Sequence, residues 1–407
     1  MTDLVRPAAA WELQTVLGKF AAQKVPVEIV GHGALRNAGR PCHAGVVVST
    51  ASMRGVTLYE PTELVMSVRA GTPLFEIEAE LASRGQMLPF EPIDIGPATG
   101  APAGGLSIGG VFATNLSGSR RVATGSARDH LLGIQGVNGR AELFKSGGRV
   151  MKNVTGLDVA RGMTGSWGTL AVLTEVTFKV VPLPESMLTL VYRNLPDDLA
   201  IEALTTAMGT PYEVSGAVHL PKGAAVRMHH AKLKALDQSL TLLRLENFSA
   251  SIAYRKDKLT EALKVFGTPL EFGVEDTWSI WGELRQLSVM PFSNSTSLWR
   301  ISTIPTKAPE IVAAIKKFMP SEAFYDWSGG LIWLEVPAAA DAGAADVRRA
   351  VAVRGGHATL IRATADVRAN VDVFEPMKPE VERLTRGIKA AFDPLGILNP
   401  GRQYANI

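Results

Sequence analysis

Residues 104–118 read GGLSIGGVFATNLSG, and this stretch decides the fold. Its glycine pairs flank small side chains, so the main chain there can lie directly against a flat ring system or a diphosphate. The amide of Asn115 can donate to such a ligand or accept from it. A tightly packed loop without a ligand is the alternative interpretation of the same stretch.

The surrounding sequence supports a ligand in this half of the chain. Residues 89–125 are rich in Gly, Pro, Ala, Ser and Thr and show little periodicity. Connections of that length in compact domains are usually functional. The 39 glycines of the chain cluster before about residue 170. Because glycine serves where backbone takes positive φ or approaches a ligand closely, this asymmetry points to an N-terminal binding site.

A first glycine loop, residues 31–37 (GHGALRN), lies between the expected strands 25–30 and 45–49. It therefore lacks the strand–loop–helix context of a dinucleotide fingerprint. It is either an ordinary turn or a nest of backbone amides that points at a pyrophosphate, with Arg36 helping to neutralise the charge.

The remaining pattern predicts an N-terminal domain, residues 1–181, an α+β cap, residues 182–375, and a C-terminal segment, residues 376–407. Expected elements are helices at 7–24, 73–84 and 378–392, a strand at 63–70, a hairpin around Asn138-Gly139 and a strand at 169–181. The breaker Pro182-Leu183-Pro184 marks the boundary.

Composition excludes several classes of protein. A net charge of +3 without a Lys/Arg run argues against nucleic-acid binding. Cys42 is the only cysteine, so the chain holds neither an internal disulfide nor an iron–sulfur cluster. Without a signal peptide or an apolar run of about 18 residues, we expect a cytoplasmic protein that meets a membrane only through partners.

Taken in order, these stretches resemble the vanillyl-alcohol oxidase, or PCMH-type, FAD-binding family. The matching positions are residues 31–37, Ser107 to Gly110, Ala113 to Asn115, Gly118, residues 125–129, residues 165–168 with Thr174-Glu175, and the ending FDPLGILNPG at 392–401. Within the family, the chain is similar to the FAD-binding E subunits of glycolate oxidase. Residues 60–65, 69–74, 85–92, 150–156, 298–300, 326–327 and 355–360 carry that likeness.

The resemblance implies an α+β fold in which a PCMH-type FAD domain precedes the cap. It implies FAD as cofactor, with the isoalloxazine between FAD domain and cap and the pyrophosphate on the first two glycine stretches. Hydride then passes from the substrate α-carbon to flavin N5. The implied cofactor contacts are Gly31, His32, Gly33, Ala34, Leu35, Arg36, Pro92, Ser107, Ile108, Gly109, Gly110, Ala113, Asn115, Gly118, Thr174, Glu175, Asn399 and Arg402.

The resemblance also implies a complex. A second FAD subunit of the same family and an iron–sulfur subunit would join this chain to oxidise glycolate, a 2-hydroxy acid, to a 2-oxo acid. A self-sufficient FAD-dependent 2-hydroxy-acid dehydrogenase and a flavin-free scaffold are the alternatives. Related dehydrogenases carry a His-x-Gly-Asp-Gly-Asn-x-His metal cluster, which is missing here. We therefore expect no metal and hypothesise that the glycolate chemistry belongs mainly to the sister subunit.

Three cap residues are the candidates for catalysis: His357, Arg300 and Asp326. Arg300 suits a bidentate contact to a substrate carboxylate, although a surface salt bridge explains it equally well. His357 is interpreted as catalytic or as packed. We expect Trp299 and Trp327 to lie in the core.

Four further features outside the cap strands have ordinary structural interpretations. Some relatives attach the flavin covalently through a histidine in this loop, so His32 either does the same or only contacts phosphate or solvent. His229-His230 suits a surface position, and Cys42 a buried inert thiol. Trp278 and Trp281 fit one helix face in the core or at a subunit contact.

Overall fold

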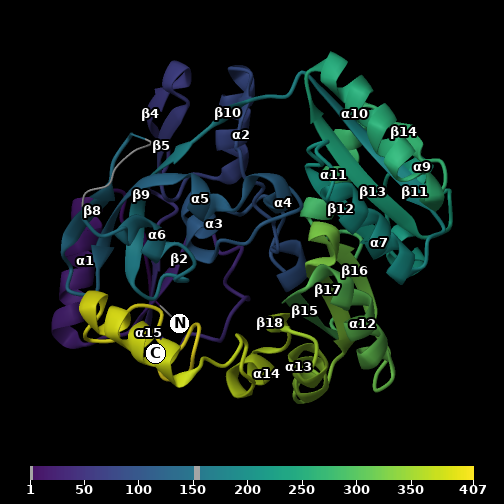
Figure 1. Cartoon of the computed structure of the whole chain (residues 1–407). Coiled ribbons are helices and arrows are strands. Elements are labelled where there is room, and N and C mark those ends of the chain that lie inside the picture. The colour runs from purple at the N-terminus through teal and green to yellow at the C-terminus, as the bar shows by residue number, and fades with distance from the viewer. Residues whose placement is uncertain (1–2, 151–155) are drawn as a thin grey trace. The chain divides into compact units, whose positions relative to one another are not determined.

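The computed structural model describes residues 3–150 and 156–407, so most of the expected motif at 150–156 lies outside the described residues. The chain divides into two compact units. The first comprises residues 1–116, 126–183 and 372–407, and the second comprises residues 117–125 and 184–371 (Figure 1). Each unit has its own sheets and its own buried apolar residues.

The first unit combines a small parallel sheet with a larger antiparallel one. The parallel sheet has the order β1-β3-β2 and the antiparallel sheet the order β4-β5-β9-β7-β8, while β6 pairs with β10 alone. The strands are β1 Asp3–Val5, β2 Val27–Val30, β3 Val46–Ser49, β4 Val56–Glu60, β5 Val65–Arg69, β6 Gln86–Met87, β7 Leu131–Asn138, β8 Leu143–Gly147, β9 Ala171–Lys179 and β10 Val181–Pro182. The strands expected from the sequence are confirmed.

The helices of the first unit follow the apolar periodicity. They are α1 Ala10–Gln23, α2 Leu74–Ser83, α3 Ile108–Thr114, α5 Ala127–His130, α6 Val159–Met163 and α15 Pro379–Phe392. The three long helices were expected. In α2, Ile77 and Leu81 lie on one face and belong to the same buried apolar cluster as Phe178 of β9. The hairpin β7–β8 is also confirmed, although residues 139–142 separate its strands, so the turn is longer than the two residues that Asn-Gly suggested.

Helix α3 was missed in the sequence because two glycines lie inside it. Glycine costs roughly 1 kcal/mol in a helix interior relative to alanine. Two contacts stabilise the helix nonetheless: Ser107 caps it by accepting from the amide of Gly110 at 3.3 Å, and Phe112 is fully buried. Gly109 is required there, because a Cβ at that position would lie 2.8 Å from the carbonyl oxygen of Ala70.

The second unit is an eight-stranded antiparallel sheet with the order β14-β11-β13-β12-β16-β17-β15-β18. Its strands are β11 Ser186–Arg193, β12 Gly216–Leu220, β13 Leu240–Asn247, β14 Leu270–Phe272, β15 Thr296–Thr303, β16 Glu322–Asp326, β17 Leu331–Pro337 and β18 Gly356–Arg362. Its helices are α4 Arg121–Thr124, α7 Asp197–Met208, α8 Lys222–Ala225, α9 Ala231–Lys234, α10 Ser249–Ala262, α11 Val274–Arg285, α12 Ala308–Lys316, α13 Ala344–Ala352 and α14 Ala365–Asn370.

The short segment 117–125 belongs to this second unit, although the first unit surrounds it in sequence. The buried guanidinium of Arg120 pairs with the buried carboxylate of Glu246 on β13. The indole of Trp327, in the 3-10 turn η5 Trp327–Gly329, donates to the carbonyl of Gly118 at 2.9 Å. Gly118 therefore lies with the second unit.

The C-terminal segment packs into the first unit. Buried Lys389 of α15 donates to the Asp393 carboxylate and to the Thr169 carbonyl, both at 2.7 Å. Leu398 forms a parallel bridge with Val27 of β2. These contacts bring the residues after Asp393 beside the loop that follows β2. Across the described part of the chain, no helix combines the length and apolarity that a membrane crossing needs.

Candidate functional site

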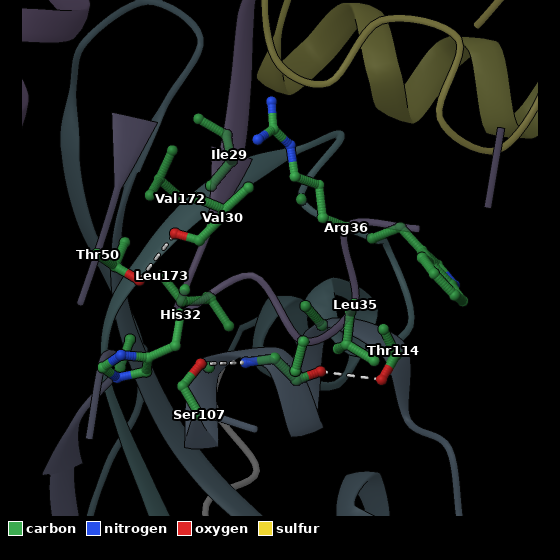
Figure 2. Close-up of a pocket in the computed structure, with 18 of the residues that line it drawn as sticks. Ile29, Val30, His32, Leu35, Arg36, Thr50, Ser107, Thr114, Val172 and Leu173 are labelled. Carbon is green, nitrogen blue, oxygen red and sulfur yellow. Dashed lines mark hydrogen bonds between the residues drawn. The ribbon is translucent and has the colours of Figure 1, made fainter. Parts of the chain in front are cut away.

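A cavity opens in the first unit, at the end of β2 (Figure 2). Its lining comes mainly from four segments, together with Thr50 and Ala70: residues 29–36, residues 105–114, residues 166–173 and the C-terminal residues Asn399 and Arg402. The first two contain the glycine stretches on which the sequence analysis relied.

The first glycine loop presents unused hydrogen-bond donors. Among the described residues, the amide N–H groups of His32, Gly33, Ala34 and Leu35 donate to no atom of the chain, whereas the amide of Arg36 donates to the Gly33 carbonyl at 3.0 Å. Gly33 has φ +95°, and a Cβ there would meet no atom within 4 Å. Consecutive free amides around open space form the concave donor set that binds phosphate oxygens.

The second glycine stretch forms the opposite wall. The Thr114 hydroxyl donates to the Gly110 carbonyl at 2.9 Å within the last turn of α3 (Figure 2). The two stretches touch at Gly31 and Ser107, where any Cβ on Gly31 would overlap the Ser107 hydroxyl. A side chain at position 31 would therefore push the two walls apart.

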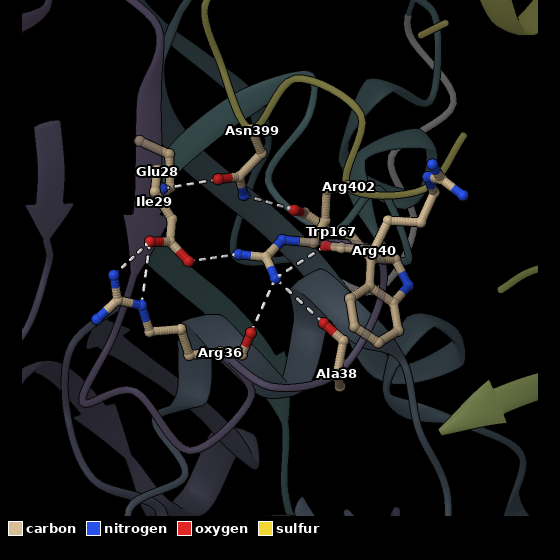
Figure 3. A network of polar contacts seen from close by, with 8 residues as sticks. All are labelled: Glu28, Ile29, Arg36, Ala38, Arg40, Trp167, Asn399 and Arg402. Atoms are coloured by element: carbon tan, nitrogen blue, oxygen red, sulfur yellow. Dashed lines mark hydrogen bonds and ion pairs between the residues drawn. The ribbon is translucent and has the colours of Figure 1, made fainter. Parts of the chain in front are cut away.

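The C-terminal segment completes the cavity through Asn399. Its side-chain amide donates to the Trp167 carbonyl at 2.8 Å and accepts from the Ile29 amide at 2.7 Å (Figure 3). Gly168 follows with φ +70°, and a Cβ there would lie 2.7 Å from Asn399 Nδ2. One side chain thus joins β2 to the turn before β9.

A buried carboxylate anchors the first loop from behind. Glu28 of β2 pairs with Arg402 through one oxygen and with Arg36 through the other, each at 2.7 Å (Figure 3). Arg402 also donates to the carbonyls of Arg36 and Ala38, at 2.9 and 3.1 Å. The loop backbone is therefore fixed by a charge pair that lies 5 to 9% exposed at Arg402 and Glu28.

His32 is exposed in the loop, and its Nε2 donates to the Gly71 carbonyl at 2.7 Å. Cys42 is half-buried near the same network, and burial raises the pKa of its thiol to about 11. The positive charge of Arg402 opposes that shift without cancelling it. A thiol with a raised pKa is a weak nucleophile, in line with the interpretation of Cys42 as inert.

Twelve of the cofactor residues named from the sequence line the cavity: Gly31, His32, Gly33, Ala34, Leu35, Arg36, Ser107, Gly109, Gly110, Ala113, Asn399 and Arg402. The others lie outside its lining. Pro92 and Ile108 are buried, and Asn115 accepts from the Arg128 amide at 3.1 Å. The carboxylate of Glu175 is bonded to Gln135, and Thr174 contributes its carbonyl to the Ala70 amide.

Sequence reasoning missed Glu28, Thr50 and Trp167. Thr50 and Trp167 line the cavity, and Trp167 has φ +55°. Only Glu28 carried a signal that could have revealed it, because an acidic residue inside the apolar strand VEIV has to find a buried partner.

The three catalytic candidates share one face of the second unit's sheet. Trp333 of β17 lies opposite both Arg300 of β15 and Phe324 of β16. His357 of β18 lies opposite Ser302 of β15. Alternate residues of a strand point to the same side, so Arg300, Asp326 and His357 lie on one face, here called the Arg300 face. Arg300 is half-buried, Asp326 buried and His357 exposed.

The other aromatic and histidine candidates divide between core and surface. Trp299 and Trp281 are buried, whereas Trp327 is half-buried and Trp278 is 49% exposed. His230 is half-buried and contacts Asp276 at 2.9 Å, so it differs from the surface position expected for it, whereas His229 is exposed. Within residues 3–150 and 156–407, no group of three His, Cys, Asp or Glu side chains is arranged to hold a metal ion.

The fold defines the class of protein. The FAD binding domain family matches residues 3–147. The structure is similar to 4-ethylphenol oxidase from Gulosibacter chungangensis, with a TM-score of 0.73 at 15% identity over 99% of this chain and 89% of that one. The chain therefore has the PCMH-type FAD-binding fold, with FAD as its cofactor.

Two glycolate oxidase subunits are among the relatives of this chain. The chain is 34% identical to glycolate oxidase subunit GlcE of Escherichia coli (strain K12) over 95% of both chains. It is 24% identical to glycolate oxidase subunit GlcD of Bacillus subtilis (strain 168), over 99% of this chain and 88% of that one. The chain therefore belongs to the family of GlcE, within the FAD-linked oxidoreductases.

Proposed function

We propose that the chain is the FAD-binding subunit of a glycolate oxidase complex. The complex oxidises a 2-hydroxy acid to a 2-oxo acid and passes the electrons on through an iron–sulfur partner. The likeness to GlcE, which extends over 95% of both chains, carries this proposal. The cavity of the first unit supports the cofactor part of it.

The residues that line the cavity fit FAD. The free amides of His32, Gly33, Ala34 and Leu35 would bind the pyrophosphate, and Arg36 would offset part of its charge. When bound, FAD supplies the two-electron acceptor for the hydride of the substrate α-carbon. The chain's own contribution is orientation, because the Glu28–Arg402 pair and Asn399 hold the cavity walls at fixed positions.

The partners follow from the electron path. A four-thiolate cluster needs more cysteines than the single Cys42, so an iron–sulfur centre has to lie in another chain. The second partner is a related FAD subunit, for which the GlcD relative is the precedent. In this scheme Arg300, Asp326 and His357 are the candidates for substrate contacts, with Arg300 toward the carboxylate.

A second candidate function is a self-sufficient 2-hydroxy-acid dehydrogenase. The presence of all three polar candidates on the Arg300 face favours it, because such an arrangement would let this chain handle a substrate by itself.

Anaerobic mixing separates the two functions. The FAD-loaded chain, alone and with its copurified partners, is mixed with glycolate, and the flavin absorbance is followed. We expect bleaching at the rate of turnover only for the assembled complex. Bleaching of the chain alone at that rate would assign the oxidation of glycolate to this subunit. A complex whose flavins stay oxidised with glycolate would overturn the proposal for this substrate.

A further inference from the structure

Arg121 and Arg300 lie over the same aromatic ring in the second unit. Each guanidinium carbon is 5.0 Å from the ring centroid of Trp327. Arg121 belongs to α4, in the segment 117–125, and Arg300 belongs to β15. A guanidinium over an indole face gains cation–π attraction, but two cations at one ring repel each other.

Among the described residues, the charge of Asp326 offsets part of this repulsion at Arg300 without forming an ion pair with either arginine. In the described part of the chain, neither guanidinium forms an ion pair, and Arg300 Nε is enclosed without a hydrogen-bond partner. The carboxylate of Asp326 is engaged elsewhere, because it accepts from the Ser119 hydroxyl at 2.9 Å and from the Trp327 amide at 2.7 Å. An enclosed donor without an acceptor is costly, so its retention calls for an explanation.

The backbone beneath the ring is strained in the same place. Trp327, Ser328 and Gly329 have φ of +52°, +60° and +97°. Side-chain-bearing residues in the left-handed region cost on the order of 1 kcal/mol or more each, and such residues cluster at ligand sites. The hydroxyl of Ser328, in the same turn, is a second buried polar atom without a partner. The two unsatisfied groups thus belong to the strained turn itself and to the arginine that lies over its Trp327 ring.

Burial lowers the pKa of Arg300 to about 10, and the charge of Arg121 adds to the shift, whereas Asp326 opposes it. An anion between or beside the two guanidiniums would reverse the effect of Arg121. Planar guanidiniums bind carboxylates through two parallel hydrogen bonds, which a lysine cannot reproduce.

We propose that Arg121 and Arg300, held at Trp327, form a binding site for a small carboxylate in the second unit. The choice of glycolate-type acids as ligands rests on the proposed function, whereas the site itself rests on the geometry around Trp327. Arg121 is the new element, because its place in a segment that interrupts the first unit hid it from the sequence analysis.

The test uses the full FAD-loaded chain and calorimetric titration with oxalate, glycolate and glycolamide, the last being glycolate without its charge. We expect both anions to bind and glycolamide to bind at least about tenfold more weakly. Arg121→Gln should weaken binding of both anions by about tenfold or more, and Arg121→Lys should restore only part of it. Trp327→Phe should remove the fluorescence change that accompanies binding.

The matched control is Arg349→Gln. Arg349 also lies over an aromatic ring, Phe318 at 4.8 Å, but it pairs with Asp346 and is 58% exposed. This variant should bind oxalate as the parent does. Equal affinity of Arg121→Gln and the parent for oxalate, or equal affinity of the parent for glycolate and glycolamide, would overturn the site. Because oxalate has no α-hydrogen to lose, its binding supports the site even where the complex fails to oxidise glycolate.

Discussion

The side chain of Asn399 donates a 2.8 Å hydrogen bond to the carbonyl of Trp167, across 232 positions of sequence. This contact closes the cavity of the first unit, and the neighbouring Gly168 leaves room for it. Because a Cβ at Gly168 would lie 2.7 Å from Asn399 Nδ2, and φ is +70°, Gly168→Ala should destabilise the chain by about 1–3 kcal/mol.

Gly168→Ala should also lower the flavin content, measured as flavin absorbance per protein. Gly162→Ala is the control, because Gly162 lies in α6 with nothing within 4 Å of a Cβ. Equal flavin content and equal unfolding midpoints for the two variants would show that Asn399 does not shape the cavity.

Gly31 and Ser107 should be coupled in FAD binding. A Cβ on Gly31 overlaps the Ser107 hydroxyl, so Gly31→Ala should weaken FAD binding strongly. Ser107→Ala removes the cap of α3, which costs about 0.5–2 kcal/mol. The double variant removes the overlapping atom, so its loss of FAD affinity should be smaller than the sum of the single losses. Strict additivity in fluorescence titrations with FAD would contradict the proposed contact between the two stretches.

The two arginines on Glu28 should differ in their effect on stability. Arg402 is 5% exposed and Arg36 is 51% exposed. Without Arg402, the buried Glu28 carboxylate keeps only the exposed Arg36 as a partner, so Arg402→Met should cost up to about 3–5 kcal/mol, the loss typical of a broken buried pair. For Arg36→Met we expect about 0–1 kcal/mol, as for exposed pairs. Urea unfolding of the FAD-loaded chain measures both, and similar losses would mean that Arg402 does not anchor the loop.

The sequence predicted those parts of the fold that depend on local patterns. Strands, long helices and the glycine loop between β2 and β3 follow from alternation, apolar periodicity and glycine content. The sequence alone could not predict that Arg120 and Arg121 lie in the second unit. The contacts that fix their segment join Arg120 to Glu246 and Gly118 to Trp327, which are 126 and 209 positions apart. Such pairings leave no local pattern.

The same reason explains what the sequence could tell of the sites. Backbone amides of residues 32–35 act regardless of side chain, so the glycine content of the N-terminal half pointed to a ligand in that half, although the loop 31–37 by itself was compatible with an ordinary turn. Arg300 was recognisable as a candidate cation, but its unsatisfied Nε and its neighbour Arg121 depend on the packing around Trp327.

The reactivity of Cys42 should rise only at high pH. Burial raises the pKa of its thiol from 9.0 to about 11, so at pH 8 the native thiolate fraction should be about 100-fold below that of the unfolded chain. Alkylation by iodoacetamide should slow accordingly. Since the folded state holds this proton more tightly, its contribution to stability is complete below about pH 9 and is lost as the pH rises through about 11. Equal alkylation rates in native and unfolded chains would contradict the burial.

His32 should hold FAD without a covalent bond. Its Nε2 already donates to the Gly71 carbonyl at 2.7 Å, which fixes the ring against the neighbouring loop. After acid precipitation of the native chain, we therefore expect the yellow colour in the supernatant. His32→Ala should weaken FAD binding only about 2- to 12-fold, the effect of one hydrogen bond of roughly 0.5–1.5 kcal/mol. His43→Ala, an exposed histidine outside the cavity lining, is the control. A yellow pellet that turns colourless in His32→Ala but not in His43→Ala would instead establish His32 as the point of flavin attachment.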